Sequence, residues 1–177
     1  MFILERDYGL YNEKIYSFLY FLTFDEVLAE DLMQETFIRA HGAKTSFRQE
    51  ANCLTWLRSI ARNLAYDHYK RKKIIQFISF KKDTQYIDPA LTPEQLLDGK
   101  EEVRHLYAAL ANLKFEFRAA IVLRKIEELS IKETAAILGW NEAKVRNNTE
   151  RGLKELGKIM KGRENDERGI QQTESTT

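Results

Sequence analysis

The chain has little of what builds stapled or membrane-spanning proteins. Its one cysteine, Cys53, excludes an internal disulfide framework and favours a reducing compartment. Its only prolines are Pro89 and Pro93, and glycines are sparse, so long uninterrupted helices are permitted. It has no run of about 18 apolar residues, the length that a membrane-spanning helix needs. Charged residues come too early in residues 1–7 for a secretory signal, so we expect a cytoplasmic protein.

What the chain does have is apolar residues at helical spacing. Residues 4–22 mark a long first helix, and no alternating pattern of several strands is visible. Thr23 and Glu26 have the spacing of a capping box, which predicts that a second helix begins there. A polar stretch at 42–52 ends it, and a third helix is predicted at 53–73. We expect these helices to form one bundle.

The pattern changes after the third helix. Residues 74–88 mix apolar and basic residues with no clean helical period, and both prolines follow. The apolar run 74–80 fits a piece of a connector, and it fits equally well a segment packed back on the first bundle. Thr92, Pro93 and Gln95 are typical of a helix start, with a cap, a proline at the first position and Gln at the third. The sequence therefore predicts a second helical unit after a connector.

The second unit contains the pattern of a helix-turn-helix. Ser130 and Glu133 form a capping box for a short helix, and Asn141 can cap a following helix that runs to about Met160. Gly139 lies between the two and permits the positive φ of a tight turn. The layout predicts a DNA-binding unit, although an ordinary helical hairpin would share it.

The last helix carries a polar, partly basic stripe opposite its packed side. The stripe is formed by Lys144, Asn147, Asn148 and Arg151, and the packed side by Val145, Thr149, Gly152 and Leu156. Asn can pair with adenine edges, while Lys and Arg reach guanine or phosphate, so such a face suits a major groove. It is also compatible with a solvated surface, and its position in the second helix of the motif favours DNA.

The third helix carries a comparable stripe. Residues at steps of four place Arg58, Arg62, Tyr66 and Lys70 on one side, with Ser59 and Asn63 beside them. Cations near a helix C-terminus are favoured by the helix dipole in any case, so the cluster at 70–73 alone indicates little. A basic stripe with an aromatic residue, next to a loop carrying Phe47 and Arg48, is better evidence for nucleic acid. Cations can pair with phosphates, and amides and rings can hold an unstacked base.

The second helix has an acidic face instead. At about 100° per residue, Gln34, Glu35 and Ile38 fall within about 60° of Asp31, while small and apolar residues cover the opposite side. An ordinary solvated helix face would have the same composition.

Together these stretches resemble the sigma-70 family, in its extracytoplasmic-function branch. The matching segments are Asp31-Leu-Met-Gln-Glu-Thr-Phe-Ile-Arg-Ala40, Phe47, Trp56-Leu57, Ile60-Ala-Arg-Asn63 with Asp67, Leu129-Ser-Ile-Lys-Glu-Thr-Ala135, Leu138-Gly139 and Val145. The resemblance implies an all-α fold of two small helical domains. Sigma region 2 would occupy residues 1–75 and the region 4 helix-turn-helix residues 93–161, joined by an extended linker at 76–92. The tail at 162–177 is polar, and we expect it to be disordered.

The resemblance also implies a role for each polar face. The residues that dock on the polymerase core would be Asp31, Gln34, Glu35 and Ile38. The residues that contact the promoter −10 element would be Phe47, Arg48, Arg58, Arg62, Asn63, Tyr66 and Lys70. The residues that contact the −35 element would be Lys144, Arg146, Asn147, Asn148 and Arg151.

The implied function is that of a sigma factor, which directs polymerase to promoters and starts transcription, here of a stress or envelope-response regulon. The implied partners are the β′ coiled coil and β flap of core RNA polymerase and promoter DNA. Family members are often held by a membrane-bound anti-sigma factor, although no residue here identifies one. The resemblance implies no small-molecule substrate, cofactor, metal or catalytic residue, and hence no enzyme.

The sequence departs from the family pattern in the second unit. The family usually has proline where this chain has Lys114, and it commonly has Arg, Leu and Ala in place of Asn148, Thr149 and Gly152. We expect Thr149 to weaken the packed face and Gly152 to cost about 1 kcal/mol against Ala. Glu150 is unfavourable near phosphate. These changes leave the −35 preference open.

Two other classes of protein would explain parts of this sequence. A stand-alone helix-turn-helix repressor or activator would explain the second unit but not the acidic face. A nucleic-acid enzyme would need a metal cluster such as Asp25, Asp31 and Glu35, yet the first two lie about 240° apart on a helix. The histidines His41, His68 and His105 also lack the spacing of metal ligands.

Overall fold

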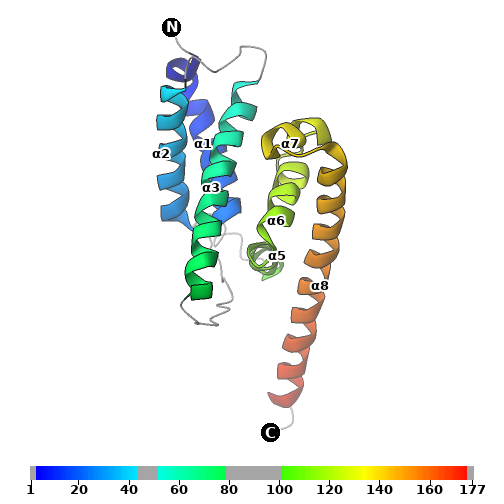
Figure 1. The fold of residues 1–177 in the computed structure, drawn as a ribbon. Coiled ribbons are helices and arrows are strands. Elements are labelled where there is room, and N and C mark those ends of the chain that lie inside the picture. Colours follow the sequence, from blue (N-terminus) through cyan, green and yellow to red (C-terminus); the bar gives the residue numbers. More distant parts are fainter. Residues whose placement is uncertain (1–2, 44–51, 79–100, 175–177) are drawn as a thin grey trace.

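The computed structural model describes residues 3–43, 52–78 and 101–174 of the chain. These residues form helices with short connections and contain no strand, which confirms the predicted all-α class. Figure 1 shows two groups of helices side by side, α1 to α3 in one domain and α5 to α8 in the other.

The first domain is a bundle of three helices, α1 (Ile3–Thr23), α2 (Glu26–Gly42) and α3 (Cys53–Ile78). Residues at helical spacing on α1, including Ile15, Phe18, Leu19 and Leu22, are essentially inaccessible to solvent and form the centre of the core. On the facing helices, small residues such as Ala29, Ala40 and Ala61 are fully buried and let the helix backbones approach.

The start of α2 differs from the prediction. Asp25, not Thr23, is the N-cap residue, and its Oδ1 accepts a hydrogen bond from the Leu28 backbone N at 3.0 Å. The Thr23 hydroxyl instead donates to the Leu19 carbonyl at 2.9 Å, so Thr23 still belongs to the last turn of α1. Phe24 forms the turn between α1 and α2 with a φ of 52°, so the N-cap lies two residues after Thr23.

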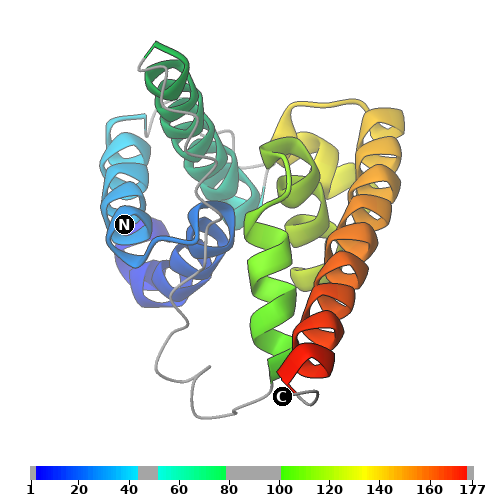
Figure 2. The same cartoon turned by 90° about the horizontal axis from the view of Figure 1, so that it is seen from below.

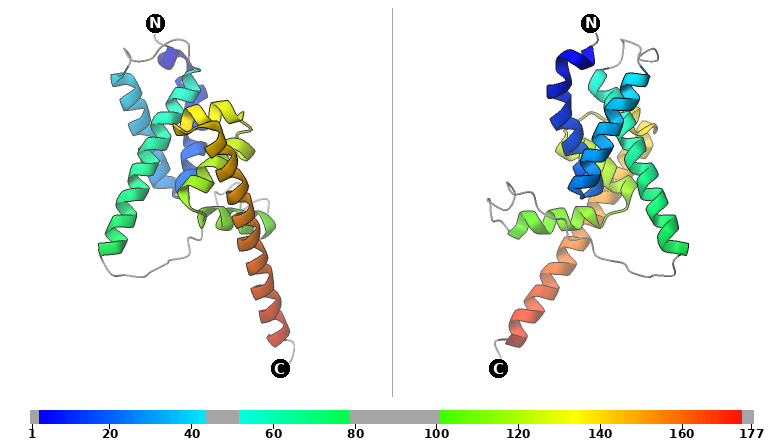
Figure 3. Two further views of the ribbon diagram at one scale, coloured as in Figure 1. Left: turned by 45° about the vertical axis from the view of Figure 1, so that its right-hand side comes forward. Right: turned by 90° about the vertical axis from the view of Figure 1, so that its left-hand side faces the viewer.

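The second domain comprises α5 (Glu101–Ala111), α6 (Phe115–Ile121), the π-helical turn η2 (Val122–Ile126), α7 (Ile131–Leu138) and α8 (Glu142–Glu174). Helix α8 projects beyond the body of the molecule (Figure 3). It continues well past Met160, through residues that the sequence analysis expected to lie in a tail. The segment is rich in Lys, Arg, Glu and Gln, which are good helix formers, and it has no proline to stop the helix.

The predicted helix-turn-helix is present with its caps. Ser130 Oγ accepts from the Glu133 backbone N at 3.1 Å, and the Glu133 carboxylate accepts from the Ser130 backbone N at 2.8 Å. Gly139 ends α7 with a φ of 65°, the left-handed conformation that favours glycine. Asn141 Oδ1 accepts from the Lys144 backbone N at 2.8 Å and so begins α8.

The two domains touch each other directly. The main contact is between α3 and α7, with further contacts from α1 to α5, α6 and η2. Seen from below in Figure 2, α3 runs along the side of the first domain that meets the second. An aromatic group crosses the junction, in which the rings of Phe21 and Tyr107 lie 5.6 Å apart between their centroids.

Candidate protein and nucleic-acid interfaces

The acidic face of α2 lies on the outside of the molecule. Asp31 and Gln34 are exposed, and Ile38 keeps 66% of its surface in contact with solvent. Glu35 is half-buried and forms an ion pair with Arg39, with 2.7 Å between Oε1 and Nε. The structure therefore places the predicted residues Asp31, Gln34, Glu35 and Ile38 together on one surface.

The same face includes a residue that the sequence analysis missed. Val27 is 71% exposed and precedes Asp31 by one helical turn. Its spacing of four residues from Asp31 is the signal that could have found it. Two exposed apolar side chains, Val27 and Ile38, thus lie on the same face as the carboxylate of Asp31, one towards each end of the helix.

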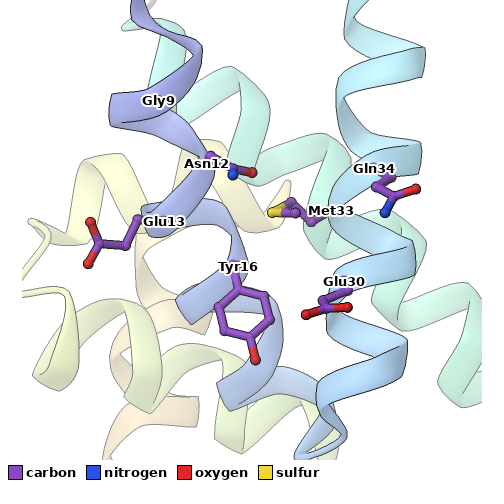
Figure 4. Close-up of a pocket in the computed structure, with 7 residues that line it drawn as sticks. All are labelled: Gly9, Asn12, Glu13, Tyr16, Glu30, Met33 and Gln34. Atoms are coloured by element: carbon purple, nitrogen blue, oxygen red, sulfur yellow. The ribbon is translucent and has the colours of Figure 1, made fainter.

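A hollow of about 320 Å³ adjoins this face, between α1 and α2. Figure 4 shows that its lining residues come from both helices: Gly9, Asn12, Glu13, Tyr16, Glu30, Met33 and Gln34. The Asn12 Oδ1 atom is buried and has no hydrogen-bond partner in the described part of the chain. Because Gln34 belongs to both surfaces, the hollow is an extension of the acidic face.

On α3, Arg58 is covered rather than exposed. It keeps 4% of its surface accessible and forms an ion pair with Glu127, which follows η2 in the second domain. Burial lowers the pKa of Arg58, and the Glu127 carboxylate partly offsets that effect. The resemblance implied a DNA contact for Arg58. In this structure its guanidinium is instead paired with a carboxylate of the same chain.

Arg62 lies between aromatic rings. Its guanidinium carbon is 4.9 Å from the centre of the Tyr66 ring and 6.0 Å from that of Trp140, and its Nη1 donates to Asn63 Oδ1 at 3.0 Å. Burial lowers the pKa of Arg62, with Tyr66 opposing that shift. Lys70 and Asn63 are exposed, and the Lys70 ammonium lies 5.6 Å from the Tyr66 ring. Two cations thus lie within cation–π distance of the Tyr66 ring.

The predicted −10 face is therefore split. Asn63 and Lys70 face solvent, while Arg58, Arg62 and Tyr66 are wholly or partly covered by the second domain. Phe47 and Arg48 lie outside the described residues.

The stripe on α8 is open. Lys144, Arg146, Asn147 and Arg151 are exposed, and Asn148 is half-buried, with its Nδ2 donating to the Lys144 carbonyl at 2.9 Å. Arg146 pairs with Glu142 at 3.0 Å on the surface, and the Lys144 ammonium lies 4.6 Å from the Trp140 ring. These contacts leave the stripe accessible to a large partner.

The packed side of α8 corrects the expectation that it is weak. A Cβ at Gly152 would lie 2.9 Å from Ile121 Cδ1 and 3.0 Å from Phe117 Cβ, so the missing side chain is what lets α8 approach α6. Thr149 is buried, and its hydroxyl is satisfied by donating to the Val145 carbonyl at 2.8 Å. Both departures from the family pattern thus suit this packing.

Two further positions of the second domain are informative. Lys114 precedes α6 with φ −56° and ψ 142°, a conformation that proline also adopts, so the lysine keeps the local backbone of the family pattern. Arg118 is buried, and its Nη1 donates to the Ala111 carbonyl at 2.8 Å. Burial lowers the pKa of Arg118 to about 10. No feature of the sequence pattern had indicated a buried arginine there.

The described residues include no cluster of three or more His, Cys, Asp or Glu side chains placed to hold a metal ion. None of their helices has the combination of length and apolarity that crossing a membrane requires.

Comparisons with known proteins agree with this division of the chain. Residues 8–74 match the family described as Sigma-70 region 2, and residues 104–156 match Sigma-70, region 4. The chain is 39% identical to the ECF RNA polymerase sigma factor SigX of Bacillus subtilis, over 86% of this chain and 81% of SigX. It is 32% identical to the RNA polymerase sigma factor YlaC of the same species, over 93% of this chain and 96% of YlaC. Among solved structures it resembles the sigma factor RpoE bound to the anti-sigma factor NepR from Bartonella quintana, with a TM-score of 0.71, 25% identity and coverage of 89% of this chain and 96% of that one.

Proposed function

The chain belongs to the sigma-70 family, in its extracytoplasmic-function branch. From this premise we propose which of its surfaces contact core RNA polymerase and which contact promoter DNA. It is a sigma factor, which directs core RNA polymerase to promoters and starts transcription. We place the region 2 domain at residues 1–75, the linker at 76–92 and the region 4 domain at 93–161. The regulon is one of stress or envelope response, as is usual in this branch.

The observation that carries the proposal is the composition and exposure of the α2 face. Asp31 lies between Val27 and Ile38, and all three are exposed while the opposite side of the helix is buried. Apolar side chains flanking a carboxylate fit a partner helix that has both apolar and basic residues. We assign this face, with Gln34 and Glu35, to the coiled coil of the polymerase β′ subunit.

The two basic stripes are assigned to promoter DNA. On the first domain, Asn63 with Arg62 and Tyr66 offers amide, guanidinium and ring surfaces that suit an unstacked base of the −10 element. Arg58, Lys70, Phe47 and Arg48 complete this set. On α8, the exposed stripe Lys144, Arg146, Asn147, Asn148 and Arg151 enters the major groove of the −35 element. Capturing a flipped base offsets an unstacking cost of a few kcal/mol, so binding drives strand opening.

The same premise sets the cellular context. Sigma factors of this family act as non-catalytic initiation subunits, and we propose that this chain has no enzymatic activity and works in the cytoplasm with polymerase. Its solved relative is bound to an anti-sigma factor, and we propose a partner of that class for this chain.

Charge reversal at Asp31 tests the docking role. We expect Asp31→Arg to weaken binding to core polymerase roughly 100-fold, because a cation would then face the basic residues of the partner. Affinity is measured with purified core enzyme, and circular dichroism should show unchanged helix content because Asp31 is exposed. Glu102→Arg, on the exposed surface of α5, is the matched control and should bind normally.

Wild-type affinity of Asp31→Arg would overturn the assignment. Tight, sequence-specific operator binding by the chain in the absence of polymerase would favour a repressor instead.

A further inference from the structure

Trp140 is a large aromatic side chain at the turn of the helix-turn-helix, directly before the N-terminal cap of α8. Its backbone N donates to the Ala135 carbonyl at 3.1 Å, and its ring is half-buried and packs against the core. Gly139, in the left-handed conformation, fixes the direction in which the chain leaves α7. The ring therefore has a defined place at the start of the helix that we assign to the −35 element.

Lys144 lies over this ring. Its ammonium is 4.6 Å from the ring centre, within the range of cation–π attraction. In the described part of the chain no carboxylate pairs with Lys144, whereas the nearby Arg146 pairs with Glu142 at 3.0 Å. The N-terminal end of a helix dipole disfavours a cation, so the ring compensates for an unfavourable position. Lys144 thus depends on Trp140 in a way that Arg146 does not.

Such a contact changes what a lysine can recognise on DNA. A free lysine is a point charge on a flexible four-carbon stem, which suits phosphate, and phosphate contacts carry no sequence information directly. A lysine whose stem is held against a ring presents its ammonium in one direction. The N-terminal residues of a recognition helix contact base edges in the major groove, where lysine can donate to O6 and N7 of guanine. An ammonium held at this end of α8 therefore suits a base.

We propose that Trp140 is a positioning residue of the −35 face, which holds Lys144 so that the ammonium reads a guanine edge instead of a phosphate. This inference rests on the −35 assignment of α8 made above, and it adds to that assignment a residue that lies outside the exposed stripe. Trp140 acts through Lys144, and the sequence preference at one base pair depends on both side chains.

The contact is tested first in the full chain without DNA, by NMR. Protons held above the face of an aromatic ring resonate upfield, so the Cε protons of Lys144 should lie upfield of those of Lys154, an exposed lysine further along α8. Trp140→Leu should return them to the position of Lys154, and Trp140→Phe should keep part of the shift. Lys144 resonances that match those of Lys154 in the parent chain would overturn the proposal.

The second measurement is the base preference of the full chain, obtained by selection from a library of duplexes with randomised sequence. We expect the parent to prefer guanine at one base pair by about fivefold, a preference that both Trp140→Leu and Lys144→Ala abolish. Trp140→Leu should leave the salt dependence of the affinity unchanged, because it removes no charge. It should also leave binding to duplexes of unrelated sequence unchanged.

A double-mutant cycle separates this positioning role from a general effect on folding. In a Lys144→Ala background, Trp140→Leu should have no further effect on the base preference. In an Arg146→Ala background its effect should persist, because Arg146 is paired with Glu142 and not with the ring. Trp140→Phe, which keeps a ring, should retain part of the preference. Equal weakening of all sequences by Trp140→Leu, or an effect that does not depend on Lys144, would overturn the proposal.

The outcomes also separate the role of Trp140 from the function on which it rests. A parent chain that selects no duplex sequence would overturn the −35 assignment of α8, and the inference with it. A parent chain that selects a sequence whose base preferences are the same in Trp140→Leu would overturn only the role of Trp140.

Discussion

The two stripes assigned to promoter DNA, on α3 and on α8, have similar composition but opposite surroundings. Each presents arginines, a lysine and at least one asparagine at helical spacing. On α8 the stripe is exposed because the other side of the helix, with Val145, Gly152 and Leu156, packs on its own domain. On α3 part of the stripe is itself a packing surface, and Arg58 retains only 4% of its surface in solvent, while Asn63 and Lys70 are exposed.

A polar stripe therefore does not by itself reveal what it faces. A helical wheel separates the core side from the other side, but the other side can meet solvent, nucleic acid or a second domain. Here Arg58 forms an ion pair with Glu127, which lies far along the sequence in a segment with no helical periodicity of its own. Only the tertiary arrangement distinguishes the two stripes.

The largest effect is expected from Asn63→Ala on α3. Losing the amide should reduce promoter opening by about 10-fold to 100-fold, since holding one unstacked base is worth about 1–3 kcal/mol. Permanganate footprinting of polymerase on a responsive promoter measures opening, and affinity for core enzyme should be unchanged.

Asn147→Ala on α8 is the matched comparison for Asn63→Ala. It should weaken duplex binding but have little effect on a template whose −10 region is already unpaired. If both variants reduce transcription from that template equally, the α3 and α8 faces do not have separate roles.

A second test concerns why the α8 stripe is open. Gly152→Ala should destabilise the second domain by about 1–3 kcal/mol, because the added Cβ would overpack against Ile121 and Phe117. Gly157→Ala, one and a half turns further along α8, meets nothing within 4 Å and should instead stabilise the helix by up to about 1 kcal/mol. Urea unfolding of each variant gives both values. Equal effects of the same sign would contradict the close approach of α6 and α8.

The sequence predicted well what depends on local spacing. The wheel of α2 placed Asp31 outside and the small residues inside, and the burial of Ala29 and Ala40 agrees. The capping box of α7 and the turn glycine Gly139 were predicted correctly because each depends on residues within one turn of each other.

The sequence failed where contacts over long separations decide the outcome. The cap of α2 was assigned to Thr23, because the left-handed corner at Phe24 has no sequence signature of its own. The effect of Gly152 on stability was predicted from helix propensity alone. It also depends on the close approach of Ile121, which lies on another helix. The junction around Arg58, Arg118 and Phe115 brings segments together that no periodicity relates.

A smaller effect is expected from Arg151→Ala on the open stripe. Losing one phosphate-contacting cation should weaken duplex binding by about 1 kcal/mol and reduce the salt dependence of the affinity by about one unit of slope. Anisotropy with duplex DNA at several salt concentrations measures both quantities. Arg104→Ala, exposed on α5, removes the same charge away from the stripe and should change neither. Equal losses in the two variants would mean that net charge, not the stripe, attracts DNA.

The smallest effect is expected in the pH dependence of stability that comes from the N-terminal cap of α7. Hydrogen bonds from Ser130, side chain first and backbone second, lower the pKa of Glu133, and the charge of Arg58 across the junction adds to this. A lowered folded-state pKa means that the contribution of Glu133 to stability is fully present above its unfolded pKa. It is lost as the pH falls through the folded value, so stability should decline there in the parent and less in Glu133→Gln, as followed by urea unfolding at a series of pH values.

NMR titration of Glu133 connects that effect to the comparison of the two stripes. Ser130→Ala should raise the pKa of Glu133 towards the ordinary glutamate value, because it removes the side-chain part of the cap, which is the largest cause of the lowered pKa. Glu127→Gln should raise the pKa of Glu133 slightly, because Arg58 is then no longer held at the junction by its carboxylate partner. If the pKa of Glu133 responds to Ser130→Ala but not to Glu127→Gln, the α3 stripe is not in contact with α7 in solution. The α3 and α8 stripes would then be equally open, and the contrast between them would disappear.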